Sequence, residues 1–201
     1  SFFDKIRLEN KIKEEKIMKA TGVVRRIDDL GRVVIPKEIR KTLRIKEGAP
    51  LEIFTDKEGE IILKKYSPIG ELTEFASGYA ETLSKTTGHI AFITDKDTVI
   101  AVSGGPKKEY LEQDVSDELE QLMEDKEVYT SKDNSDIAMP ITKNGKNDKK
   151  SNGQVVYPII SNGDTIGTVI LLSKNANTKM NDVENKLAQS AATFLGSQME
   201  I

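Results

Sequence analysis

The sequence contains no cysteine and a single histidine, His89. Without cysteine there is no disulfide, no thiolate nucleophile and no cysteine ligand for a metal. No apolar run approaches the roughly 20 residues that a membrane-spanning helix needs, and no secretory signal pattern opens the chain. The Walker, GxGxxG, HExxH and nucleophile-elbow motifs are also missing. We therefore expect no catalytic residues, no cofactor and no metal, and a cytoplasmic location.

The charge of the chain is divided unevenly along its length. The 201 residues are 37% hydrophobic and 31% charged, which is typical of globular proteins, and their number suggests one or two domains. Residues 18–66 hold 12 Lys/Arg and 8 Asp/Glu, whereas residues 67–201 hold 13 and 21. A basic head on an acidic body is expected when only one end of a protein meets nucleic acid.

The basic head is rich in β-branched residues and predicts two hairpins separated by a short helix. Its turns are Asp28-Asp29-Leu30-Gly31 and Asp56-Lys57-Glu58-Gly59, whose acidic residues and glycine suit tight turns. Residues 36–43 begin with proline and place Ile39 and Leu43 four positions apart, which predicts the helix. The expected strands are 22–24, 32–35, 51–54 and 60–63.

The basic side chains of this head define its chemistry. Arg25 and Arg26 end the first predicted strand, and Arg32 opens the second. Arg40 and Lys41 lie on the predicted helix. The planar fork of a guanidinium matches phosphate oxygens and guanine edges. From the residues alone, this surface is either an ordinary solvated basic face or a DNA-binding face.

The block TGVVRRIDDLGRVVIPKEIRKTL, followed by LEIF and EIILKKY, resembles the swapped-hairpin β-barrel of the AbrB family of bacterial transition-state regulators. In that family two chains interleave their hairpins in one barrel. The resemblance implies a homodimer in which the run Val33, Val34 and Ile35 is covered by the second copy. A core of about 50 residues is marginal alone, and an unbroken apolar run needs cover on both faces.

The same resemblance implies double-stranded DNA as the partner. The family's DNA-contacting arginines fall on Arg25, Arg32 and Arg40, and Arg26 lies where the family carries a basic residue. Lys41 departs from an arginine that is often found at its position. Lysine keeps the charge but loses the bidentate fork, so a contact from Lys41 to a base is less well supported than one to phosphate.

From residue 67 the pattern predicts an α+β domain with an antiparallel sheet flanked by helices. Asn162-Gly163 is a strong turn signal between two of its strands. The polar stretch 131–152 predicts a long loop with a short strand at 137–141. Helices are expected at 69–86, within 107–125 and at 180–199, and strands at 90–94, 98–102, 155–160 and 167–172.

This order of elements resembles a GAF domain, a small-molecule sensing and dimerisation module. The expected domains are therefore 18–66 for DNA binding, 67–88 as a linker helix and 89–201 for sensing and oligomerisation. We expect residues 1–17 to be a non-native or over-called extension, since the AbrB family starts at a methionine that corresponds to Met18. The pairing of an AbrB-type head with a GAF body resembles a family of regulators that act in the forespore of spore-forming Firmicutes.

The apolar faces of the helices 69–86 and 180–199 are the expected assembly surface, where Leu83, Leu187 and Phe194 could join barrel dimers into a tetramer. The sequence does not identify a ligand for the GAF-like half. His89 is expected to be structural. Ser103-Gly104-Gly105 fits a strand-to-helix turn better than an anion-binding nest.

Together these observations predict a regulator that activates or represses sporulation genes. It would bind DNA as a homodimer or homotetramer, with no membrane partner. The alternative is an antitoxin, because similar barrels also head toxin–antitoxin partners. The 135 residues from 67 to 201, with strands and helices of their own, argue against that alternative.

Overall fold

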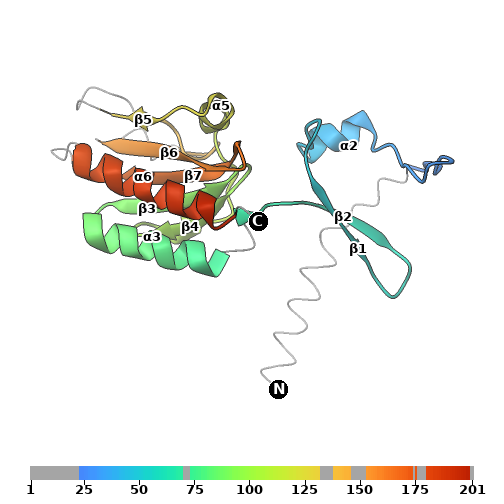
Figure 1. The fold of residues 1–201 in the computed structure, drawn as a ribbon, viewed down its shortest axis with the longest axis horizontal. Coiled ribbons are helices and arrows are strands. Elements are labelled where there is room, and N and C mark those ends of the chain that lie inside the picture. Colours follow the sequence, from blue (N-terminus) through green and yellow to red (C-terminus); the bar gives the residue numbers. More distant parts are fainter. Residues whose placement is uncertain are drawn as a thin grey trace, which may run out of the picture. The chain divides into compact units, whose positions relative to one another are not determined.

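The structure of the protein is a computed structural model (Figure 1). It describes residues 23–69, 73–131, 138–145, 153–173, 175 and 180–199. The predictions for residues 1–17 and for a start at Met18 lie outside these ranges. The chain divides into two compact units, Ser1–Leu51 and Glu52–Ile201. The predicted domain boundary after Tyr66 stays a prediction. The division above rests on contacts within one chain, whereas a hairpin interleaved with a second chain would make most of its contacts with that chain. Within the described ranges, no helix has the length and apolar character needed to cross a membrane.

The basic head forms one short helix and one paired hairpin. Helix α2 (Lys37–Thr42) follows Pro36, and strands β1 (Leu51–Thr55) and β2 (Ile61–Lys65) make a two-stranded sheet. These elements confirm the predicted helix and the second hairpin.

The first predicted hairpin is only partly present. Its turn is formed, since the Asp28 N–H donates to the Arg32 carbonyl at 3.1 Å and the Gly31 N–H to the Asp28 carbonyl at 3.0 Å. The flanking residues, 23–27 and 32–36, form no strand. The prediction of strands here is therefore wrong for the single chain. A strand needs a neighbour for its backbone groups, and among the described residues none lies beside these segments beyond the turn.

The larger unit contains a five-stranded antiparallel sheet with the order β4-β3-β7-β6-β5. Four strands match the predicted ones. The fifth, at the edge beside β6, was not predicted because two residues are too few to show an alternating pattern. The predicted strand at 137–141 does not form over its described part, 138–141. The strands are β3 (Ile90–Asp95), β4 (Val99–Ser103), β5 (Tyr129–Thr130), β6 (Gln154–Ser161) and β7 (Asp164–Leu172).

The turn between β6 and β7 confirms the strongest local signal in the chain. Asn162 has φ 49° and Gly163 has φ 84°. Two consecutive positive φ values mark the turn whose twist matches that of the strands it joins.

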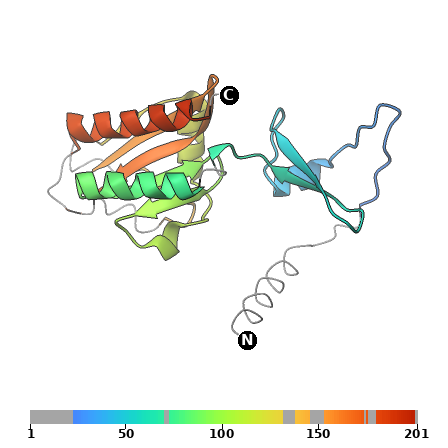
Figure 2. The same cartoon turned by 60° about the horizontal axis from the view of Figure 1, so that its bottom comes forward.

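Helices cover both faces of this sheet. α3 (Thr73–Thr87) and α6 (Asp182–Ser197) lie side by side on one face, as Figure 2 shows. On the other face lie α4 (Lys107–Tyr110), α5 (Asp117–Asp125) and residues 138–145. Side chains of β3 alternate between the faces: Ala91 and Ile93 pack under α3 and α6, while Phe92 packs on the opposite side. With both faces covered, the strands read as continuous apolar runs.

α6 packs closely on the sheet because small residues line its inner face. Ala188, Ala192 and Gly196 are all buried there. A Cβ built on Gly196 would lie 2.1 Å from the carbonyl oxygen of Ile160 in β6. Such a distance is far inside van der Waals contact, so only glycine fits without moving the helix or the strand.

We expect Gly196→Ala to lower the free energy of unfolding by about 1–3 kcal/mol, the usual range for overpacking a well-packed core. Gly78→Ala is the matched control, since Gly78 also lies inside a helix but has nothing within 4 Å of its added Cβ. That change should be neutral or stabilise by up to about 1 kcal/mol through helix propensity. Chemical denaturation of both variants measures the difference. Equal stabilities would contradict the close packing of α6.

Candidate nucleic-acid interface

Five basic side chains form the predicted DNA-binding set, and all of them are exposed: Arg25, Arg26, Arg32, Arg40 and Lys41. Arg25 and Arg26 lie in the extended segment before the first turn. Arg32 ends the turn, and Arg40 and Lys41 lie in the last turn of α2. Three local structures within 17 residues therefore carry the charge.

The turn at Asp28 holds Arg32 through both its backbone and its side chain. Asp28 Oδ1 accepts the backbone N–H groups of Leu30 at 3.0 Å and of Arg32 at 2.8 Å. Asp28 Oδ2 accepts the Nε–H of Arg32 at 2.7 Å. Gly31, with φ 77°, takes the left-handed conformation that closes the turn. One carboxylate thus caps the loop with one oxygen and holds a guanidinium with the other.

These contacts favour the ionised form of Asp28. The backbone N–H of Arg32, and after it the guanidinium, hold the pKa of Asp28 below its ordinary value. The stabilisation of the turn is therefore complete above the unfolded-state pKa of Asp28. It is lost as the pH falls through the lower pKa of the folded state.

The turn between β1 and β2 repeats this loop geometry without an arginine. Asp56 Oδ1 accepts the backbone N–H groups of Glu58 at 3.0 Å and of Glu60 at 2.8 Å. The Asp56 N–H donates to the Glu60 carbonyl, and Gly59 has φ 89°. Glu60 occupies the place that Arg32 has in the first turn. Both segments have the pattern Asp-x-x-Gly-x, so the repeat is visible in the sequence, although its shared hydrogen bonding is not.

The end of α2 positions the other two basic residues. The Ile45 N–H donates to the Arg40 carbonyl at 2.8 Å, and the Arg44 N–H donates to the Lys41 carbonyl at 3.2 Å. This is the double hydrogen-bond pattern of a Schellman motif. Arg44 takes the left-handed position with φ 52°, where glycine is more usual. The helix therefore ends at Thr42, the residue after Lys41, and both Arg40 and Lys41 are exposed.

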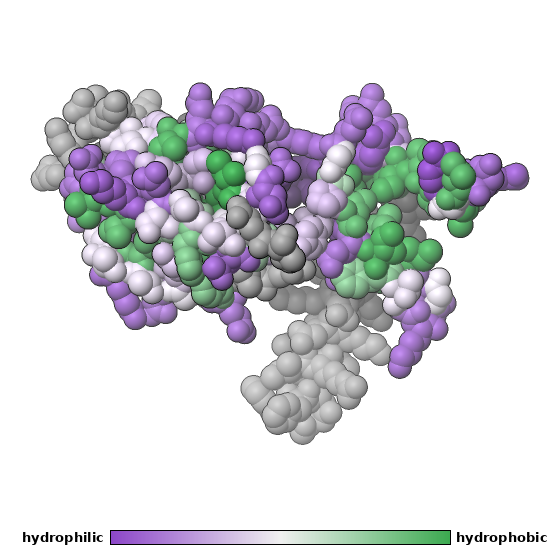
Figure 3. All heavy atoms as spheres, viewed as in Figure 1, coloured by the Kyte–Doolittle hydropathy of each residue, from purple (hydrophilic) through white to green (hydrophobic). Residues whose placement is uncertain are grey.

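No side chain in residues 23–68, all of which the structure describes, is buried. Large apolar side chains lie open to solvent, among them Val34 at 71% exposure and Ile53 at 69%. Figure 3 shows hydrophobic residues on the surface around β1 and β2. Of the predicted interface residues, Val33 and Val34 are exposed and Ile35 is half-buried.

The predicted assembly residues of the larger unit divide into three cases. Leu83 is 4% exposed and packs in the core between α3 and the sheet, so its prediction as an assembly residue is wrong. Leu83 lies on the face of α3 that packs against the sheet. The periodicity of the sequence alone did not distinguish this inner face from the outer one. Leu187 is half-buried against the same core. Phe194 remains exposed, at 40%.

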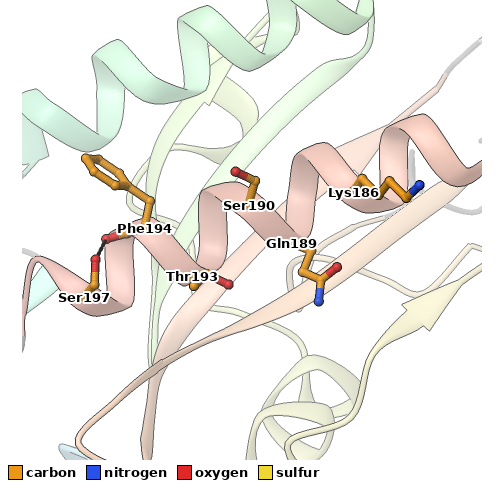
Figure 4. A pocket seen from close by; sticks show the side chains of 6 residues that line it. All are labelled: Lys186, Gln189, Ser190, Thr193, Phe194 and Ser197. Atoms are coloured by element: carbon orange, nitrogen blue, oxygen red, sulfur yellow. Dashed lines mark hydrogen bonds between the residues drawn. The ribbon is translucent and has the colours of Figure 1, made fainter.

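Phe194 belongs to an aromatic cluster that spans α3 and α6. Its ring centroid lies 5.8 Å from that of Phe75 and 5.7 Å from that of Tyr79. Along the outer side of α6, Figure 4 shows Phe194 projecting to one side of a shallow depression and Gln189 to the other. The depression is lined by Lys186, Gln189, Ser190, Thr193, Phe194 and Ser197.

The remaining ligand candidates have structural roles. His89 is buried, and its Nε2 lies 3.6 Å from Glu184 Oε1 at the start of α6. Gly104 lies against the hydroxyl of Ser84, which donates to the His89 carbonyl at 2.7 Å, so Ser103-Gly104-Gly105 packs as a turn. In the part of the chain that the structure covers, no group of three or more His, Asp or Glu side chains could hold a metal ion.

Comparison with known families gives two matches that divide the chain. Residues 71–200 match the family of stage V sporulation protein T C-terminal domains, described as a transcription factor. Residues 24–71 match the MazE family of bacterial antitoxins, described as antidote-toxin recognition.

Comparison with individual proteins gives a relative of nearly the whole chain. Stage V sporulation protein T of Bacillus subtilis strain 168 is 52% identical over 183 residues, which cover 91% of this chain and 99% of that protein. The transition state regulatory protein AbrB of the same strain is 63% identical over 51 residues, or 25% of this chain and 52% of that protein.

Solved structures support the fold of the larger unit. The cyanobacteriochrome receptor PixJ superposes with a TM-score of 0.53 and 15% identity, covering 67% of this chain and 98% of that one. The GAF domain of a phosphoenolpyruvate-protein phosphotransferase from Coxiella burnetii gives 0.51 and 15%, covering 64% and 82%. These identities are low, so they establish a GAF-like fold for the larger unit and nothing about its ligand.

Proposed function

The chain belongs to the stage V sporulation protein T family, and we propose that it is a non-enzymatic, DNA-binding regulator of sporulation genes. Two copies form the DNA-binding barrel, and the GAF-like unit assembles the protein and senses a small molecule. Such a regulator works in the cytoplasm of the forespore, where the chromosome lies.

The observation that carries this proposal is that no side chain in residues 23–68 is fully buried. Burying apolar area is the main favourable term in folding, at about 25 cal/mol per Å². A segment that fully buries no side chain has no core, yet its sequence has the β-branched apolar runs of a β-structure. Interleaving with a second copy gives Val33, Val34 and their neighbours both a core and the missing strand partners.

The charges of the same segment favour DNA as its ligand. The five exposed basic residues lie on the head, whose net charge is positive, while residues 67–201 are strongly acidic. Phosphate contacts from such residues supply most of the affinity of a DNA-binding protein and fix its register. The acidic body, in contrast, would be repelled by the same duplex.

The antitoxin alternative has one observation in its favour, the MazE match over residues 24–71. That match covers the barrel segment alone. The remainder of the chain is a folded, five-stranded domain that belongs to a transcription-factor family. A toxin that copurifies with the protein and is encoded beside it would support the alternative.

A genome-wide map of the DNA bound in sporulating cells tests the proposed function. We expect the protein to occupy discrete promoter regions, and transcripts from those promoters to change when the gene is deleted. Alanine at Arg25, Arg32 and Arg40 should remove the occupied sites while the protein stays at its normal level. Uniform occupancy, or unchanged transcripts in the deletion strain, would contradict the proposal.

A further inference from the structure

We infer that Asp28 is a positioning residue for DNA binding, which holds the guanidinium of Arg32 by its Nε edge and presents its two Nη groups to the DNA backbone. This inference rests on the proposed function, because it concerns how one arginine of that interface is aimed. Asp28 is negatively charged and would be repelled by the DNA backbone, so its charge alone does not indicate a role in DNA binding.

The geometry of the contact supports a positioning role. The Nε–H of Arg32 donates to Asp28 Oδ2 at 2.7 Å, and the same carboxylate accepts the Arg32 backbone N–H at 2.8 Å. The arginine is therefore held at both ends, by its main chain and near the tip of its side chain. A guanidinium has five N–H donors, and this contact uses one of them. Within the described part of the chain, neither Nη atom of Arg32 makes a hydrogen bond.

The surroundings leave the free edge of the guanidinium open to a ligand. The Arg32 side chain is 70% exposed even though it is paired. An exposed ion pair contributes little to stability. Its effect on binding can be larger, because a long side chain that is already ordered loses less conformational freedom when it meets phosphate.

The second turn shows that the pairing is not needed to build the loop. Asp56 caps its loop with one oxygen in the same way, but residue 60 is a glutamate, which cannot be held by a carboxylate. The capping oxygen is therefore the structural element common to both turns, and the second oxygen of Asp28 is the element specific to Arg32.

The test compares Asp28→Asn with Asp56→Asn in the full-length protein. Asparagine keeps an oxygen that can cap the loop, but its amide nitrogen cannot accept the Nε–H of Arg32. Each variant removes one negative charge from one turn, so the two are matched in charge and loop geometry. The probe is a fluorescent duplex selected from random-sequence DNA by the wild-type protein, and affinity is measured by anisotropy.

Charge and positioning predict opposite results for Asp28→Asn. Removing a negative charge beside DNA should tighten binding, whereas freeing the arginine should weaken it. We expect Asp28→Asn to weaken DNA binding roughly twofold to tenfold for each copy of the chain that contacts the DNA. This is the effect of having to order one long side chain on binding. Asp56→Asn should bind as tightly as wild type or more tightly, and both variants should keep the wild-type mass and melt at the same temperature as each other.

Arg32→Ala completes a double-mutant cycle. It separates the positioning role of Asp28 from the proposed DNA-binding function. We expect Arg32→Ala to weaken binding and Asp28→Asn to cause no further loss in that background. If Arg32→Ala weakens binding but Asp28→Asn alone does not, the positioning role is wrong and the DNA interface stands. If Asp28→Asn weakens binding equally with and without Arg32, its effect is structural and the inference fails. If Arg32→Ala binds as tightly as wild type, the proposed contact surface itself is wrong.

Discussion

A variant that carries Arg25→Ala, Arg32→Ala and Arg40→Ala should lose measurable binding to its DNA target while remaining a folded oligomer. Each arginine that contacts a base or a phosphate is worth about 1–3 kcal/mol, or roughly fivefold to 150-fold in affinity. Both copies in a dimer carry the three substitutions, so the combined effect exceeds the range of an ordinary binding assay. All three side chains are exposed, so little stability is at stake.

The single variants give a second measurement, the salt dependence of binding. The slope of log affinity against log salt falls by about 0.9 for each phosphate that the protein no longer neutralises. One substitution changes both copies of a dimer, so each single variant should flatten the slope by nearly two units if its arginine binds phosphate. An arginine that contacts a base should weaken binding most at one position of the target.

Lysines elsewhere on the surface provide the control for net charge. Lys57, Lys96 and Lys108 are exposed and lie outside the predicted set. Changing all three to alanine removes the same number of positive charges as the arginine variant. This control should bind within a few-fold of wild type. A loss as large as that of the arginine variant would mean that overall charge, rather than a defined interface, governs binding.

Phe194→Glu should split the full-length protein into barrel dimers and weaken DNA binding by about 100-fold. If the GAF-like units join two barrel dimers, the second barrel binds at a high effective concentration, which adds about 10²-fold or more in avidity. The aromatic cluster of Phe75, Tyr79 and Phe194 is the exposed apolar feature that spans α3 and α6. A carboxylate in its centre would have to be buried unpaired in the assembly, at a cost of several kcal/mol.

Gln189→Glu is the matched control for this experiment. Gln189 lies on the same helix, is exposed and would receive the same charge, but it projects away from Phe194 in Figure 4. Light scattering gives the mass of each variant beside its affinity. If the wild-type protein is already a dimer and Phe194→Glu binds DNA equally well, the GAF-like unit does not act by avidity. Sensing would then be its better explanation.

Local chemistry in the sequence was enough to predict many elements of the structure. The pairs Asp28 with Gly31 and Asp56 with Gly59 predicted two tight turns, and Asn162-Gly163 predicted the third. Each prediction held because these residues stabilise a turn through their own backbone and nearest neighbours. The helices followed from a 3.6-residue period and the strands from apolar runs, both of which are properties of single segments.

Contacts between segments that are distant in the sequence could not be predicted from such patterns. Leu83 and Phe75 both belong to the apolar residues of α3, but the packing of that helix on the sheet buries one and leaves the other exposed. The cluster of Phe75 with Phe194 joins residues far apart in the sequence. The close approach of Gly196 to the carbonyl of Ile160 likewise became known only from the fold.

The basic head shows the same division between local and tertiary information. Its charge, its turns and its exposed arginines are local properties, so the sequence alone was sufficient to place them. No strand forms on either side of the first turn, because a strand needs hydrogen-bond partners that the described residues do not supply there. The contact from Asp28 to the Nε of Arg32 depends on how the loop directs two side chains toward each other. Sequence spacing allowed this contact, and only the folded turn decided that one carboxylate would both cap the loop and hold the arginine.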